Sequence, residues 1–125
     1  MRELKIGMEK ETKVVCLDEP GAGGACHSYE VRPNVPQNAD GTDPLGPSFA
    51  TVYFQDGPIM ESGPNGCQNE NLLAIVIDRL QGFQSGDFKC RENALALTKC
   101  EEALMWLNKR TSDRRARGVE GKSEK

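Results

Sequence analysis

The stretch ENALALTKCEEALMWLNKRTSDRRARG, residues 92–118, decides the fold of this chain. Its apolar residues recur at the three- and four-residue spacing of a helix, and Gly118 is the first residue suited to end one. We therefore expect one long α-helix over residues 88–117, followed by a flexible tail over residues 118–125. On a helical wheel, one apolar stripe holds Cys90, Leu97, Cys100, Leu104 and Leu107, with Ala96 and Ala103 beside it.

The same helix has a second apolar surface, because Leu95 and Trp106 fall roughly opposite the main stripe. At full length the helix would measure about 45 Å, whereas a compact domain of this size is roughly 35 Å across. Part of the helix should therefore leave its own globule, which favours contact with a second copy of the chain. The alternative is that Thr111, Ser112 and Asp113 end the helix early.

The first half reads as an antiparallel β region, residues 1–62. Short β-type runs lie at residues 3–7, 12–17, 25–32 and 48–54, and residues 58–62 offer a further short strand. The Pro- and Gly-rich turn at residues 18–24 joins two of these runs into a hairpin. Residues 33–47 hold four prolines, so we expect a long connection there and not a central strand.

A first helix over residues 69–84 precedes the long one, with Asn69 or Asn71 as its cap. It is apolar nearly all round, so we expect it to be buried on more than one side. Together these elements predict an α+β fold. An N-terminal antiparallel β-sheet is followed by two C-terminal α-helices, the second of which is long and used in self-association. The length of 125 residues fits a single domain.

Charge is distributed unevenly along the chain. The net charge is −3, but residues 109–125 carry a balance of +4, so residues 1–108 carry −7. An acidic body repels long nucleic acid, whereas a local basic end suits a small anion. No apolar run approaches the ~20 residues that span a bilayer, and the first residues lack a signal core. We therefore expect neither a membrane partner nor secretion.

The cysteines give no sign of a metal centre. There are five, an odd number, at Cys16, Cys26, Cys67, Cys90 and Cys100, and no two form a CxxC pair. The single histidine, His27, lies next to Cys26, which is too little for a zinc site. We expect reduced thiols and no metal; a structural disulfide is the alternative.

Three features of the helical half are candidates for ligand contact. Arg110 and Arg114 lie four residues apart, so both guanidinium groups share one helix face and match a phosphate or pyrophosphate; alternatively they compensate the helix dipole. Asn93 lies inside the apolar stripe, either as a ligand-binding amide or as a satisfied core asparagine. Phe83 lies in the Gly-flanked break QGFQSG, either as a stacking platform for a purine or as a hydrophobic staple.

Motifs of catalysis and of phosphate binding are absent. The stretch PGAGGAC, residues 20–26, lacks the lysine and spacing of a phosphate-binding loop, and a tight turn accounts for it better. One histidine and no clustered carboxylates leave little for acid–base chemistry. We therefore expect a binding protein and not an enzyme.

The segment from Phe83 through Arg117, with NALALTKCEEALMWLNK followed by arginines, resembles the C-terminal helix of the phage anti-Thoeris family of cyclic ADP-ribose sponges. A similar segment recurs in phage sponges for cyclic di- and trinucleotides. By motif the resemblance covers about a quarter of the chain, and the N-terminal half agrees in layout only.

This resemblance implies sequestration of a cyclic ADP-ribose isomer, a signal that host TIR-domain enzymes make on infection, without cleavage and without a cofactor. It implies a homo-oligomer, dimer or hexamer, in the cytoplasm of the infected bacterial host, with the pocket formed between protomers. Cyclic oligonucleotides could occupy a separate site.

Family residues carry over at four positions. Phe83 would stack on the adenine and Asn93 would hydrogen-bond the ligand. Arg110 and Arg114 would hold the pyrophosphate. The stretch TKVVCLDE, residues 12–19, offers no aromatic side chain for the other face of the ligand.

Two other classes of function compete with sequestration. An enzyme that hydrolyses a cyclic nucleotide would return its ligand altered. A regulator that binds nucleic acid or protein through the basic end would bind long duplexes with a steep salt dependence.

Overall fold

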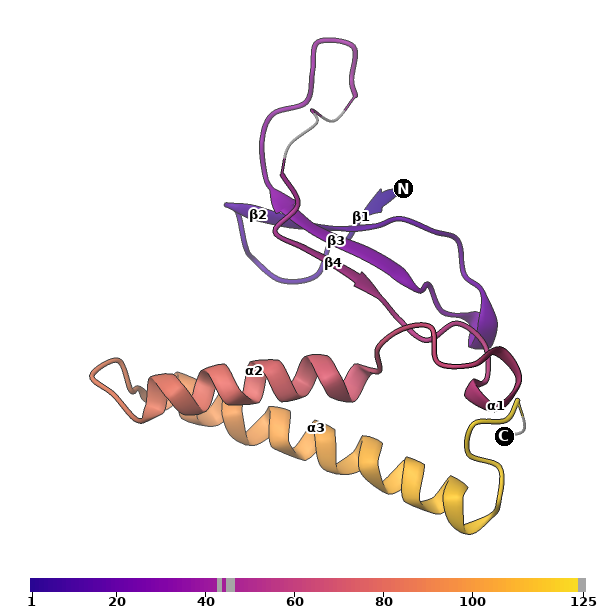
Figure 1. Cartoon of the computed structure of the whole chain (residues 1–125). Coiled ribbons are helices and arrows are strands. Elements are labelled where there is room, and N and C mark those ends of the chain that lie inside the picture. Colours follow the sequence, from indigo (N-terminus) through magenta and orange to yellow (C-terminus); the bar gives the residue numbers. More distant parts are fainter. Residues whose placement is uncertain (43, 45–46, 124–125) are drawn as a thin grey trace. The chain divides into compact units, whose positions relative to one another are not determined.

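Figure 1 shows the computed structural model of the chain, which describes residues 1–42, 44 and 47–123. The chain forms two compact units. Residues Met1–Gly57 and Ser62–Gly66 make the first, and Pro58–Glu61 with the chain from Cys67 onward make the second. The long connection expected over residues 33–47 falls partly outside the described residues.

The first unit is built on a four-stranded antiparallel sheet, which confirms the predicted β region. Its strands are β1 (Arg2–Glu3), β2 (Thr12–Cys16), β3 (Ser28–Pro33) and β4 (Ala50–Tyr53), in the order β1-β2-β3-β4. The predicted hairpin is β2–β3, with Cys16 opposite Tyr29. Val15 and Cys16 are fully buried and form the core of this unit.

Residues 58–62 form a helical turn, α1 (Ile59–Ser62), and not the further strand that their composition suggests. Gly57 has a left-handed φ of 84°, which turns the chain before Pro58. Pro58 then fits a helix start, because it lacks the N–H that would go unbonded there. The Met60 N–H donates to the Gly121 carbonyl over 2.8 Å, so it is not available to a sheet ladder.

The second unit is a hairpin of two helices that lie side by side, α2 (Asn69–Gln84) and α3 (Arg91–Ala116) (Figure 1). Gln68 caps α2, and the Asn71 side chain completes the cap by accepting the Gln68 N–H over 2.8 Å. The helix α3 continues through residues 111–113, so the expectation of an unbroken helix is confirmed over that stretch. Gly118, with φ of 75°, follows its end.

The helix α3 begins three residues later than residue 88, because Cys90 is its N-cap. The Cys90 thiol accepts the Asn93 backbone N–H over 3.4 Å. The Gln84 side chain bridges the turn between the helices. Its amide donates to the Cys90 carbonyl over 3.1 Å, and its oxygen accepts the Cys90 N–H over 3.0 Å. These bonds hold the two helix ends together.

The seam of the hairpin follows the predicted apolar stripe. The least exposed residues of α3 recur at spacings of three and four: Asn93, Leu97, Cys100, Leu104, Leu107, Thr111 and Arg114. Their counterparts on α2 are Glu70, Leu72, Leu73, Ile77, Leu80 and Gln84. Most of these side chains are only half-buried, and α2 and α3, which the structure describes in full, contain no fully buried hydrophobic residue.

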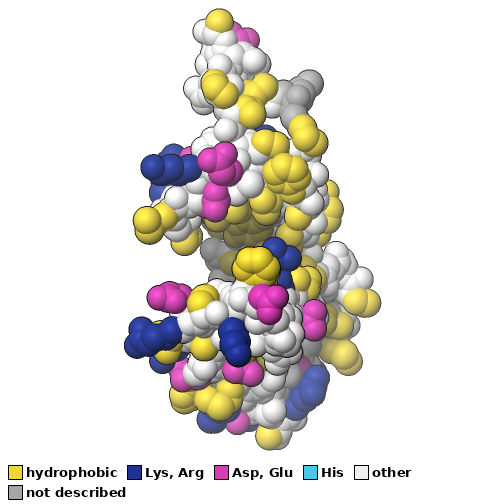
Figure 2. Space-filling model, turned by 90° about the vertical axis from the view of Figure 1, so that its left-hand side faces the viewer, with side chains coloured by type: hydrophobic (Ala, Val, Ile, Leu, Met, Phe, Trp, Pro, Cys, Tyr) yellow, Lys and Arg dark blue, Asp and Glu magenta, His cyan; other side chains and the backbone are white. Residues whose placement is uncertain are grey.

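Large hydrophobic side chains therefore remain exposed on both helices. On α2 they are Ile75, Val76 and Phe83, and on α3 Leu95, Met105 and Trp106. Figure 2 shows exposed hydrophobic side chains interspersed with charged ones on one face of the molecule. Within the described residues, no helix is long and apolar enough to cross a membrane.

Candidate ligand-binding site

Five residues of α3 and its C-cap residue line an open hollow of about 530 Å³ at the C-terminal end of the helix. They are Trp106, Lys109, Arg110, Asp113, Arg114 and Arg117. Their spacing of three and four residues puts them on one helix face, and most of that face points away from the seam. The hollow has the size of a small-molecule site.

The hollow carries a net positive charge. Asp113 is its one acidic residue, and the Lys109 amine lies 2.7 Å from that carboxylate. This pair is exposed and lies at the i, i+4 spacing, so the charges of Lys109 and Asp113 cancel each other. The Glu120 carboxylate lies 3.2 Å from Arg114 and offsets the charge of that arginine, so the hollow keeps a smaller positive excess, which suits a small anion such as a pyrophosphate.

The two arginines predicted as a clamp both line this hollow, but their surroundings differ. Arg110 is exposed, and no described residue offers its side chain an ion pair or a hydrogen bond. Arg114 is only 8% exposed. On the helical wheel it lies between the seam and the hollow, which explains its burial.

The tail after α3, expected to be flexible, folds back onto Arg114. The guanidinium donates to the Glu120 carboxylate over 3.2 Å, to the Val119 carbonyl over 2.8 Å and to the Lys122 carbonyl over 3.0 Å. Val119 is itself buried at 8% exposure. The tail follows this path because a buried guanidinium needs acceptors, and carbonyls and a carboxylate supply them.

Phe83 lies in the last turn of α2, at the opposite end of α3 from the hollow. Its side chain is 37% exposed. The Arg79 guanidinium lies over the ring, 4.9 Å from its centre, as a cation–π pair one turn earlier on the helix.

Asn93 lies in the first turn of α3, at the same end of the hairpin as Phe83. It is half-buried on the seam, as the wheel predicts. Its backbone N–H is used by the helix cap, but its side-chain amide has no hydrogen bond to any described residue. The amide is not buried away from water, so its role as a ligand contact stays a prediction.

The structure brings the four predicted residues together only in pairs. Phe83 and Asn93 flank the turn between the helices, and Arg110 and Arg114 line the hollow. Seventeen residues of α3 separate Asn93 from Arg110, which corresponds to about 26 Å along the helix axis. No ligand of nucleotide size spans that distance within one copy of the chain.

Several residues with a place in this site were not singled out from the sequence. Lys109 and Arg117 line the hollow. Arg117 could have been identified, because it continues the i, i+4, i+7 spacing of basic residues that begins at Arg110. Glu120, which holds Arg114, and Gln84, which holds the turn, gave no sequence signal. Each makes its contact across a turn, and such contacts leave no periodic pattern in the sequence.

Comparison with known proteins places the chain in a family. Residues 48–112 match the Acb2/Tad1 hairpin domain family. The chain is also 66% identical over 77 residues to Thoeris anti-defense 1 of Bacillus phage SBSphiJ7. That alignment covers 62% of this chain and 54% of the relative, so the chain spans about half the length of the relative it matches. Because the family match covers more than half of the residues and contains the whole of α2 and most of α3, the chain belongs to the Acb2/Tad1 hairpin family.

Proposed function

We propose that this protein sequesters a cyclic ADP-ribose isomer made by TIR-domain enzymes, and so blocks Thoeris immunity in the cytoplasm of an infected bacterium. The observation that carries the proposal is the basic hollow beside Trp106, in a chain that is 66% identical over 77 residues to a Thoeris anti-defence protein. A cyclic ADP-ribose presents a pyrophosphate, which bidentate guanidinium groups recognise, and an adenine, which an aromatic ring recognises.

The pocket we propose is shared between two copies of the chain. Phe83 and Asn93 of one copy would meet Arg110 and Arg114 of another, because about 26 Å separates the two ends within one copy. An antiparallel arrangement of two hairpins would place each arginine end against the other copy's turn, and would form two such pockets. The chain would then act as a homo-oligomer, either a dimer or a hexamer.

Each group has a defined task in this pocket. Adenine would stack on the face of Phe83 opposite Arg79, whose guanidinium covers the other face. Arg114 is already oriented by the tail, and a phosphate oxygen would take the place of the Glu120 carboxylate as its anionic acceptor. Arg110 is exposed, so it would become ordered when the ligand binds.

The energetics require a closed pocket. Capture of a signal at nanomolar to micromolar concentration needs roughly −8 to −12 kcal/mol. Charge-assisted bonds supply about 1.5–3 kcal/mol each and a stack about 1–3 kcal/mol, but an exposed helix face loses most of this to water. Burial between two copies would exclude that water and satisfy the exposed apolar side chains at the same time.

We infer binding without cleavage. Asp113, the only acidic residue that lines the hollow among those described, is paired with Lys109 and so is a poor general base. The one histidine of the chain, His27, belongs to the sheet unit and is far from α3 in sequence.

Calorimetric titration with cyclic ADP-ribose isomers, followed by heating and chromatography of the released ligand, tests the proposal. We expect tight binding with the ligand recovered unchanged, and weaker binding in Arg110→Ala. A degraded ligand would make the protein an enzyme. Heat only from cyclic di- or trinucleotides would assign it to the other sponge class, and binding only to long duplexes would make it a regulator.

A second experiment tests the coupling of assembly to binding. Trp106 is 63% exposed in the single chain and lines the hollow. Trp106→Glu should split the oligomer and abolish binding, because it puts an unpaired charge in the proposed interface. Asn108→Glu adds the same charge at an exposed position on the other side of α3 and serves as the control. A monomeric Trp106→Glu protein that still binds tightly would refute the shared pocket.

A further inference from the structure

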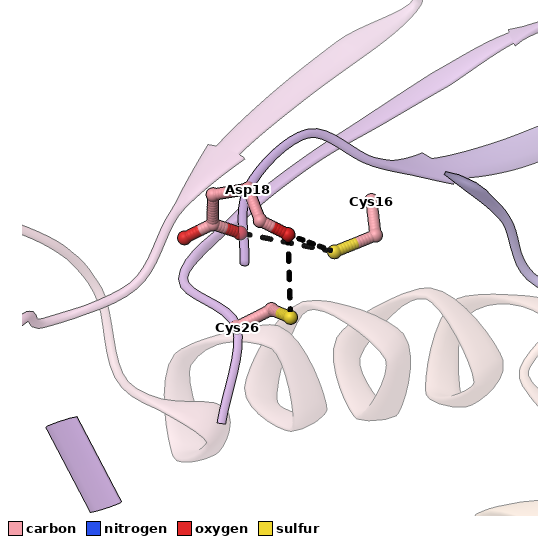
Figure 3. Close-up of side chains that lie close together, drawn as sticks. All are labelled: Cys16, Asp18 and Cys26. Atoms are coloured by element: carbon pink, nitrogen blue, oxygen red, sulfur yellow. Dashed lines mark hydrogen bonds between the residues drawn. The ribbon is translucent and has the colours of Figure 1, made fainter. Parts of the chain in front are cut away.

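Two buried cysteines of the sheet unit converge on one aspartate (Figure 3). The Cys16 thiol is fully buried and the Cys26 thiol is 8% exposed. Cys16 Sγ lies 3.4 Å from the Asp18 carbonyl oxygen and 3.7 Å from its Oδ1, and Cys26 Sγ lies 3.5 Å from the same carbonyl. One ligand atom from each of the three side chains lies within 4.8 Å of the other two.

The fold gathers these residues, which are not close in the sequence pattern. Cys16 is the last residue of β2, Asp18 begins the turn, and Cys26 lies two residues before β3. Because β2 and β3 pair antiparallel, the end of β2 lies beside the start of β3. The Cys16 and Cys26 sulfurs therefore both lie close to Asp18. The absence of a CxxC pair argued against a metal site in the sequence. That argument covers only ligands that are close in sequence, and it does not cover ligands that the fold brings together from two strands.

We propose that Cys16, Cys26 and Asp18 bind one thiophilic divalent cation, with Zn²⁺ as the best match. Ligand atoms on a tetrahedral zinc ion lie about 3.6–3.8 Å apart, so small side-chain rotations would bring all three onto one ion. Water would complete the shell, since Cys26 keeps some exposure. Both thiols would lose their protons to solvent on binding.

The groups around the cluster match this role. The Asp18 carboxylate is fixed by backbone N–H groups, from His27 over 3.0 Å and from Ser28 over 3.2 Å, and this is the outer support that ligating carboxylates use. The Arg2 guanidinium lies 3.9 Å from Cys26 Sγ. Two thiolates and one carboxylate carry −3, which the ion and Arg2 together neutralise.

Such a site would cross-link the end of β2 to the start of β3 and stabilise the sheet unit. It is independent of the proposed nucleotide pocket, which uses other residues.

The test is titration of the full chain, kept reduced, with Zn²⁺ and with Co²⁺ alone. The background variant Cys67→Ser/Cys90→Ser/Cys100→Ser removes the other three thiols. We expect one ion per chain, a thiolate-to-cobalt absorption band and a higher melting temperature with Zn²⁺, all retained in that background. Cys26→Ser should weaken binding by about 100-fold and Asp18→Asn by about 10-fold.

Asp18→Asn keeps an oxygen that accepts the backbone N–H groups, so it separates loss of charge from loss of fold. Cys16→Ser carries the highest risk of misfolding, so Cys26→Ser is the deciding variant. Protection of Cys16 and Cys26 from alkylation by Zn²⁺, mapped by mass spectrometry in the wild-type chain, gives a readout that needs no variant. Absence of stoichiometric binding in the triple-serine background, or binding that survives Cys26→Ser, would overturn the proposal.

Discussion

Two variants that each lack one half of the pocket should restore binding when they assemble together. In Phe83→Ala the adenine stack is lost, and in Arg110→Ala one phosphate contact is lost. Each should weaken affinity by roughly ten- to a hundredfold, since these contacts contribute about 1–3 kcal/mol. Because about 26 Å of α3 separates the two ends, each pocket of the proposed oligomer would take one end from each copy.

If equal amounts of the two variants assemble at random, the fraction of intact pockets can be calculated. Half of the turn ends carry an intact Phe83 and half of the arginine ends carry an intact Arg110. About a quarter of all pockets therefore combine two intact ends and bind with wild-type affinity, whether the oligomer is a dimer or a hexamer. Co-expression with two different tags provides the mixed oligomer, and calorimetric titration counts its high-affinity sites.

The matched control co-expresses Phe83→Ala with Asn93→Ala. Both changes lie at the turn end, so no combination of copies gives an intact turn end, and no high-affinity sites should appear. If the first mixture also lacks high-affinity sites although the tags show that mixed oligomers have formed, the pocket lies within one copy and the shared site is refuted.

Three further predictions follow from single contacts. Arg110→Ala should weaken ligand binding and leave the melting temperature unchanged, whereas Arg114→Ala should also destabilise the chain by about 1–3 kcal/mol, because the acceptors in the tail lose their partner. Equal melting curves would contradict this. Gln84→Ala should lower the unfolding free energy by about 1 kcal/mol in denaturant titration, through its two bonds across the turn; an unchanged midpoint would count against it. Arg32 donates to the Glu30 carboxylate and lowers the pKa of that carboxyl. The contribution of this pair to stability is therefore present above the ordinary carboxyl pKa and is lost as the pH falls through the folded-state pKa. Glu30→Gln should flatten the fall in melting temperature between about pH 5 and pH 3, and an unaltered slope would exclude this pair as a contributor.

The helical half was predictable because its periodicity is long and strong. The spacing of Leu97, Cys100, Leu104 and Leu107 identified the seam, and Gly118 identified the helix end. The predicted start at residue 88 was three residues too early, because Cys90 serves as the N-cap although cysteine is not among the preferred capping residues.

Contacts between distant segments were not predictable in the same way. The folding of the tail onto Arg114 depends on burial at the edge of the seam, which a wheel locates only within about one residue. The helical turn α1 forms because the Met60 N–H meets the Gly121 carbonyl, a partner 61 residues away in sequence. Cys16 and Cys26 come together only through the β2–β3 register.

Contact with a second copy would serve this hairpin in two ways, by covering its exposed apolar surface and by completing its ligand site. Two helices that bury no hydrophobic residue fully have little of the burial that usually stabilises a packed pair. If a second copy covers Trp106 and its neighbours, the same contact brings a turn end against an arginine end and removes water from between them. Assembly would then strengthen ligand binding, and by thermodynamic reciprocity the ligand would strengthen assembly by the same factor. A sponge built in this way would need no catalytic group and no large core, because the apolar surface that the monomer exposes to water would be the surface that closes the pocket.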